Sequence, residues 1–132
     1  MQPGPPPPMQ PFRLCTANVT SWRRWCALRA HADVLLLQEA RVKPEDVQEL
    51  QRESLREGWA ALPGQVVDGV HLLLALCRTS AVQMREVPMA EVGRHAGRMQ
   101  HLLCTWGRGQ ALHLVHCYGY AEGARAFDKT LT

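Results

Sequence analysis

The run Asp-Val-Leu-Leu-Leu-Gln-Glu, at residues 33–39, is a short apolar stretch that ends in two polar residues. A compact run of this composition is typical of a strand buried on both faces of a parallel sheet, so we expect a strand over Asp33–Gln38. The residue after it then lies at the carboxyl end of the strand, where open α/β sheets bind their ligands. The stretch therefore predicts an α/β fold and makes Glu39 a candidate site residue.

A strand and a helix are predicted before this run. Phe12–Val19 has the length and apolar content of a strand, and Ser21 after it is a good N-cap for a helix that extends to about His31. Trp22, Trp25 and Cys26 in that helix recur at three- and four-residue spacing, which puts them on one apolar face. The chain thus opens with a strand, a helix and a second strand.

Another helix is predicted after the run. Pro44 suits the first helical position, and Glu45 and Asp46 complement the positive end of the helix dipole. The apolar residues of this helix are Val47, Leu50 and Leu55, and Gly58 is a plausible residue to end it.

The second half of the chain has strand patterns instead. Val70–Cys77 is expected to form a core strand entered from a turn at Asp68-Gly69, and Ala81–Val87 a weaker one. Met99–Trp106 and Ala111–Tyr118 flank a glycine-containing turn and predict an antiparallel hairpin. Together these patterns predict a mixed β-sheet with flanking helices, an α/β (α+β) fold.

The two ends of the 132-residue chain differ from its middle. Residues 1–11 hold six of the nine prolines, so we expect a disordered leader of polyproline II character before a domain at residues 12–132. Such a leader fits an SH3- or WW-type groove, although an incidental disordered tail is the simpler explanation. A helical pattern begins at residues 121–131.

Composition excludes several classes of protein. The apolar fraction of 46% is too high for a wholly disordered chain, and the longest apolar run is far too short for a membrane span. No signal peptide is visible, and the five cysteines are never spaced as Cys-x-x-Cys. A soluble, intracellular protein with reduced thiols is therefore expected. A net charge of +3 is compatible with a polyanionic partner but does not require one.

Asn18 and Glu39 each stand where a predicted strand ends. A carboxylate held there is a suitable magnesium ligand, and an amide beside it can donate a hydrogen bond to a phosphate oxygen. The alternative is that both residues merely cap loops.

Four segments extend this pattern along the chain. Thr16–Trp22 contains Asn-Val at a strand end, Ala32–Glu39 ends in Gln-Glu, Gly69–Arg78 is a glycine-led apolar strand, and Leu114–Gly119 ends in Tyr-Gly. In this order they resemble the N-terminal half of the endonuclease/exonuclease/phosphatase superfamily. The resemblance implies the first half of a four-layer α/β/β/α sandwich.

The resemblance also implies roles for four residues. Glu39 would bind Mg²⁺, with Mn²⁺ as the alternative ion, and Asn18 would contact the phosphate or orient the nucleophile. Tyr118 would donate a hydrogen bond to the scissile phosphate, and Arg41 would hold a phosphate oxygen. The implied chemistry is metal-assisted hydrolysis of nucleic acid or another phosphodiester.

The sequence also departs from the superfamily pattern at several positions. Thr20 replaces an acidic residue of some branches, and His116 stands where the family often has asparagine. Nothing matches the later Gly-Asp-Phe-Asn and Ser-Asp-His segments, which supply the water-activating aspartate and the general-base histidine. We therefore expect a truncated metal-dependent phosphoesterase domain that is inactive alone. The alternatives are a non-catalytic α/β binding module, or a degenerate fragment that exposes an apolar face for lack of a second sheet.

Overall fold

Strand β2 (Val34–Gln38) lies inside a four-stranded mixed sheet, which we call the first sheet. The computed structural model describes residues 12–89 and 97–119. The strand order is β1-β2-β6-β3, where β1 (Leu14–Asn18) is parallel to β2, and β6 (Leu74–Arg78) is antiparallel to both β2 and β3 (Trp59–Pro63). Because the first four residues of β2 are buried, the interpretation of this run as a fully buried strand is confirmed.

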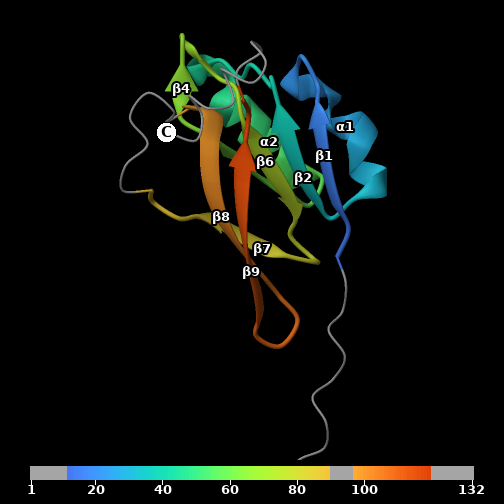
Figure 1. Ribbon diagram of the computed structural model, residues 1–132. Helices are drawn as coiled ribbons and strands as arrows, with labels where there is room; N and C mark the ends of the chain where they lie inside the picture. Colours follow the sequence, from blue (N-terminus) through green and yellow to red (C-terminus); the bar gives the residue numbers. More distant parts are fainter. Residues whose placement is uncertain (1–11, 90–96, 120–132) are drawn as a thin grey trace, which may run out of the picture.

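A second, antiparallel sheet stacks on the first (Figure 1). It consists of β7 (Gln83–Glu86), β8 (Met99–Trp106) and β9 (Gln110–Cys117), with β8 in the centre. The predicted hairpin is thus confirmed as β8 and β9. Two short strands, β4 (Val66–Val67) and β5 (Val70–His71), form a separate hairpin.

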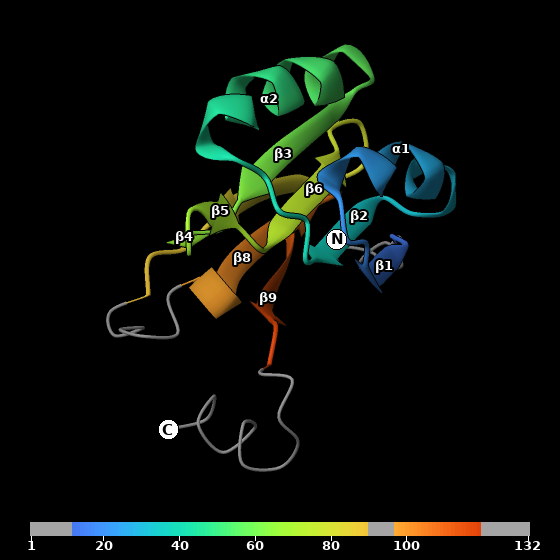
Figure 2. The ribbon, with the colours of Figure 1, turned by 90° about the horizontal axis from the view of Figure 1, so that it is seen from above.

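Helical segments cover the face of the first sheet that is turned away from the second (Figure 2). The first comprises a 3-10 turn (Trp22–Arg24), α1 (Trp25–Leu28) and a further 3-10 turn (Arg29–His31). The second comprises a 3-10 turn (Pro44–Asp46) and α2 (Val47–Arg56). The Ser21 side chain accepts a hydrogen bond from the backbone N of Arg23, so Ser21 is an N-cap as predicted.

Two apolar cores join these layers, and the side chains of β2 divide between them. Leu35 and Leu37 pack with the helices, whereas Val34 and Leu36 pack against the second sheet. The core beneath the helices also contains three buried indoles, those of Trp22, Trp25 and Trp59. The core between the sheets also contains Ala75, Cys77, Val82, Leu102 and Cys104. The α/β fold class and its layer order are therefore those predicted.

The second sheet corrects the expectation that the first sheet would have a bare apolar face. Leu102 and Cys104 of β8 are fully buried against that face, because the odd and even residues of an antiparallel strand point to opposite sides. The apolar face of the first sheet is therefore covered by this chain itself.

The strands in the middle of the chain also differ from the predictions. Val70–Cys77 is two strands, because the carbonyls of Leu72 and Leu73 accept hydrogen bonds from Ala40 and Gly64 and so leave the ladder of the first sheet. Strand β3 is a further element that the sequence did not predict.

The prediction that Leu55 and Cys26 lie on the buried faces of their helices is wrong. Leu55 is 67% exposed, and Ser54 takes the buried position on α2 one residue earlier. Cys26 is also exposed. Residues 1–11 and the pattern at 121–131 lie outside the described residues. No helix in the described ranges is long and apolar enough to cross a membrane.

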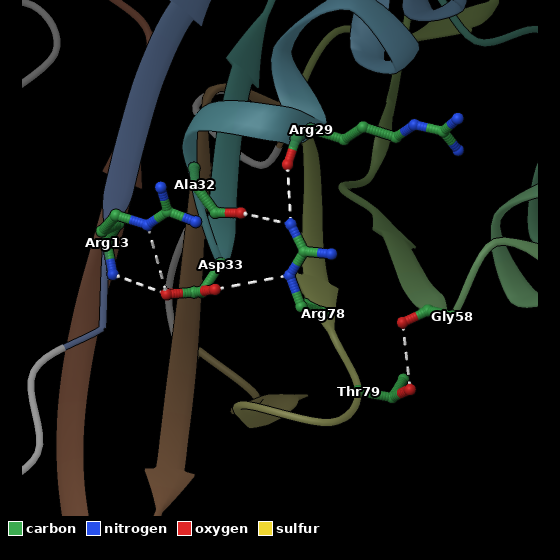
Figure 3. A network of polar contacts seen from close by, with 7 residues as sticks. All are labelled: Arg13, Arg29, Ala32, Asp33, Gly58, Arg78 and Thr79. Carbon is green, nitrogen blue, oxygen red and sulfur yellow. Dashed lines mark hydrogen bonds and ion pairs between the residues drawn. The ribbon is translucent and has the colours of Figure 1, made fainter.

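A polar network anchors the end of the first sheet opposite Glu39 (Figure 3). Arg78 Nη2 donates hydrogen bonds to the carbonyls of Arg29 (2.8 Å) and Ala32 (3.2 Å), and its Nε donates to Asp33 Oδ1 (3.4 Å). Asp33 Oδ2 accepts from the backbone N of Arg13 (2.9 Å). One guanidinium thus ties β6 to the end of the first helical segment and to the start of β2.

We expect Arg78→Ala to lower the free energy of unfolding by about 2 kcal/mol, because it leaves two carbonyls and a carboxylate without their charged donor. Urea denaturation at pH 7 measures the effect. Arg29→Ala is the matched control, since its guanidinium makes an ion pair with Glu57 (2.7 Å) on the surface and the Arg29 carbonyl is retained. The control should cost less than about 1 kcal/mol, and equal losses would contradict the role given to Arg78.

Candidate functional site

The carboxyl ends of β1 and β2 lie side by side, as the sequence predicts. The parallel register pairs Asn18 with Gln38, and Glu39 follows directly. Thr20, Glu39 and Arg41 all adopt left-handed backbone conformations here, with φ of 60°, 53° and 54°. Each costs about 1 kcal/mol or more for a residue other than glycine, and such strain gathers at binding and catalytic sites. The backbone at the ends of β1 and β2 is thus held in unfavourable conformations by the surrounding fold.

Glu39 lies between Tyr118 and Arg41. The Tyr118 hydroxyl donates a hydrogen bond to Glu39 Oε1, and Arg41 Nη2 is 3.9 Å from Glu39 Oε2. The hydrogen bond to this carboxylate, with some burial, raises the pKa of Tyr118, so the phenol keeps its proton at neutral pH. The group therefore combines an anionic oxygen ligand, a cation and a neutral hydroxyl donor.

Tyr118 is fixed by the second sheet. Its backbone N donates to the carbonyl of Arg98 (2.9 Å), and the guanidinium of Arg98 lies 5.2 Å from the centre of its ring. Glu39 belongs to the first sheet, so the site forms only when the two sheets are stacked.

Asn18 is less closely engaged than the other three predicted residues. Its side chain is exposed at the end of β1, next to the position of Gln38. The structure thus brings Glu39, Arg41 and Tyr118 together and leaves Asn18 beside them, one strand away.

A chain of polar side chains that the sequence did not predict lies directly behind Glu39 and Tyr118. Gln38 Nε2 is 2.8 Å from His116 Nε2, and His116 Nδ1 is 3.1 Å from Gln100 Oε1. Gln100 Nε2 donates to the carbonyl of Leu62 (2.9 Å). We call the side chains of Gln38, His116 and Gln100 the relay. It connects β2 of the first sheet to β9 and β8 of the second sheet, and then contacts β3 of the first sheet.

The relay favours a neutral His116. The Gln38 amide nitrogen is a donor that also contacts Thr16 Oγ1 (2.9 Å) and the Leu36 carbonyl (3.0 Å), which favours the tautomer in which His116 Nε2 accepts and Nδ1–H donates to Gln100. Burial lowers the pKa of His116 to about 4, which agrees with this neutral form. His116 is thus a satisfied core histidine, as its strand position predicts.

An open cleft of about 400 Å³ runs along the edges of both sheets and ends at Tyr118. Leu14 and Thr16 of β1 line one wall, and Val115 and Cys117 of β9 line the other. Glu39, Arg41 and Asn18 are not among the residues that line this cleft.

The donor set suits a hard cation better than a soft one. No group of three or more His, Cys, Asp or Glu side chains that could hold a metal lies among residues 12–89 and 97–119. Mg²⁺ commonly uses only one or two carboxylates and completes its shell with water and phosphate oxygens. Glu39, whose side chain is 24% exposed, therefore fits a magnesium ion, whereas a structural zinc site needs more protein ligands.

The protein is an α/β sandwich: two stacked sheets have helices on one outer face, and the Glu39 carboxylate lies at the strand ends. No protein-family profile and no curated protein sequence matches the chain. Solved structures do match its fold. AP endonuclease LMAP from Leishmania major has a TM-score of 0.62 at 17% identity, over 91% of this chain and 46% of that one.

D. rerio TDP2, in a complex with a single-strand DNA product, has a TM-score of 0.56 at 21% identity, over 88% of this chain and 50% of that one. A form of D. rerio TDP2 humanized by 14 mutations gives 0.58 at 23%, over 85% and 46%. The chain thus spans about half the length of these solved proteins. The fold is therefore the one that the predicted resemblance to the endonuclease/exonuclease/phosphatase superfamily implies.

Proposed function

We propose that this chain carries the metal- and phosphate-binding half of a phosphodiesterase site for nucleic acid. The observation that carries the proposal is the contact of Glu39 with Tyr118 and Arg41, which joins the two sheets, with Glu39 and Arg41 both on left-handed backbone. The fold it shares with an AP endonuclease and with a DNA-bound protein supports nucleic acid as the substrate.

Each residue has a defined task in this proposal. Glu39 would hold Mg²⁺, or Mn²⁺ in its place, and the ion would supply positive charge for the phosphate and the leaving oxygen. The Arg41 guanidinium pairs with a phosphate oxygen, and the Tyr118 hydroxyl donates to another. The Asn18 amide, exposed at the end of β1, donates to the phosphate or orients the attacking water.

Proton transfer is the part that these residues do not supply. Arg41 stays charged and Tyr118 stays protonated at neutral pH, so neither accepts a proton from water. His116 is buried, and both of its ring nitrogens are engaged with glutamine side chains. We therefore propose that this chain binds metal and phosphodiester but does not hydrolyse the ester at a useful rate.

We expect Glu39→Gln to weaken Mn²⁺ binding by about tenfold or more, because the amide keeps the size of the side chain and removes its charge. Electron paramagnetic resonance of free Mn²⁺ measures the affinity, and competition by Mg²⁺ extends it to that ion. Glu49→Gln is the matched control, because Glu49 lies on exposed α2 and pairs with Arg23 at 3.8 Å.

Unchanged Mn²⁺ affinity in Glu39→Gln would contradict the metal site and favour a non-catalytic binding module. Robust Mg²⁺-dependent nicking of plasmid DNA by the purified chain, lost in Glu39→Gln, would instead support the site and overturn the proposed inactivity.

A further inference from the structure

The four outer edges of the two sheets are protected unequally. On one side, β3 ends in Pro63 and the short β7 carries Arg85 and Glu86. Proline and charged residues are the usual means by which proteins keep an edge strand from pairing with another chain. On the other side, neither β1 nor β9 contains proline or a Lys, Arg, Asp or Glu residue, and β9 is eight residues long.

The two unprotected edges border the same cleft. Leu14 and Thr16 of β1 face Val115 and Cys117 of β9 across the space of about 400 Å³ described above. A single body placed on this side of the sandwich therefore covers both edges and the cleft between them.

Exposed apolar side chains gather on the same two strands. Five large apolar residues of the described part of the chain are strongly exposed, and three of them lie on β1 or β9. These are Leu14 (47% exposed), Leu112 (42%) and Val115 (56%). An exposed apolar strand without protection is expected to be covered by a partner.

The open hydrogen-bonding groups of β9 follow from its pairing with β8. Tyr118 N donates to the Arg98 carbonyl, and hydrogen-bonded pairs alternate along an antiparallel ladder. The even-numbered residues of β9 therefore bond to β8. The backbone N–H and C=O groups of Ala111, His113, Val115 and Cys117 point away from β8 and have no partner strand in the part of the chain that the structure describes.

We propose that the β1 and β9 edges form an interface between two copies of this chain, in which β9 pairs antiparallel with its own symmetry mate. A strand that pairs antiparallel with itself about a two-fold axis is self-complementary, so the open groups of one copy meet those of the other. The absence of formally charged residues on β9 means that no like charges meet across the axis.

The interface extends the second sheet from three strands to six and buries Val115 beside the axis. This inference does not depend on the proposed phosphodiesterase site.

Sedimentation velocity of the full chain, over about a hundredfold range of concentration, tests the proposal. The wild type is expected to approach twice its chain mass of 14.8 kDa at the upper end. Val115→Lys puts a charge beside the axis and should weaken self-association by about tenfold or more. Leu55→Lys is the matched control, since Leu55 is exposed on α2, away from both edges, and should leave association unchanged.

Val115→Pro provides a second test at the same position. Proline removes the outward N–H of Val115, which the β8–β9 ladder does not use, so it should prevent pairing without unfolding the hairpin. Circular dichroism and a thermal melt confirm that each variant is folded. A wild type that stays monomeric, or a dimer that survives Val115→Lys, would overturn the proposal, as would association that Leu55→Lys weakens equally.

Discussion

Leu102→Ala is expected to lower the free energy of unfolding by about 3 kcal/mol, because it opens a cavity between the two sheets. Leu102 is fully buried on β8 and belongs to the core that also contains Leu36 and Ala75 of the first sheet. The loss combines the transfer of the removed methyl and methylene groups with the cavity that they leave. Urea denaturation of the two proteins at neutral pH measures it.

Leu112→Ala is the control for this substitution. Leu112 lies on the neighbouring strand β9 and points to the same side of the second sheet, but it is 42% exposed. The same change should therefore cost about 1 kcal/mol or less. If both variants lose equal stability, the two sheets are not packed through the inner face of β8. Loss of all cooperative unfolding in Leu102→Ala alone would mean that the chain depends on this core even more strongly.

Strand β2 could be predicted because four apolar residues in succession favour a buried strand, and the flanking helices have clear caps at Ser21 and Pro44. Strand β3 of the same sheet could not be predicted. The strands of the second sheet could be predicted, but the face by which they pack on the first sheet has no clear sequence signal. In β8, buried Gln100, Leu102 and Cys104 alternate with half-buried His101 and Leu103, so polar and apolar residues occur on both faces.

Which residues of α2 are buried could also be predicted only in part. Val47 and Leu50 face the core as their spacing predicts, but the third buried position is occupied by Ser54 and not by Leu55. The Ser54 hydroxyl donates to the carbonyl of Gln51, which satisfies it inside the helix. A pattern that counts only apolar residues does not detect a buried serine that is hydrogen-bonded within its own helix.

The candidate site also contains residues that could be predicted from sequence and residues that could not. Glu39 and Asn18 could be placed from their positions at strand ends, and Arg41 and Tyr118 from the superfamily resemblance. The relay behind them could not be predicted, because Gln38 and His116 are 78 residues apart and meet only when the sheets stack. The left-handed conformations of Thr20, Glu39 and Arg41 also have no sequence signal, since none of them is glycine.

The stability of the protein is expected to fall between pH 7 and pH 5 by about 2 kcal/mol through His116 alone. Burial lowers the pKa of His116 to about 4 in the folded chain, against 6.5 for an ordinary histidine. Above pH 6.5 both the folded and the unfolded chain hold this histidine neutral, so it causes no change. As the pH falls from 6.5 towards 4, the unfolded chain binds a proton that the folded chain excludes, and unfolding becomes easier.

Comparison with two variants isolates this contribution from that of the other histidines. His116→Asn removes the titrating group, so its free energy of unfolding should depend on pH less steeply than that of the wild type, by about 1 kcal/mol per pH unit near pH 5. Its stability at pH 7 is lower because the relay loses part of its contacts, but only the slope carries the test. His113→Asn changes an exposed histidine on the same strand and is the matched control.

Parallel slopes for all three proteins would mean that His116 is protonated freely in the folded state. That outcome requires the Gln38 amide to turn its oxygen towards the imidazole and away from its contact with the Leu36 carbonyl. A steeper wild-type slope instead means that the neutral relay joins the two sheets behind Glu39 and Tyr118. Acid then loosens the stacking on which the Glu39–Tyr118 contact depends.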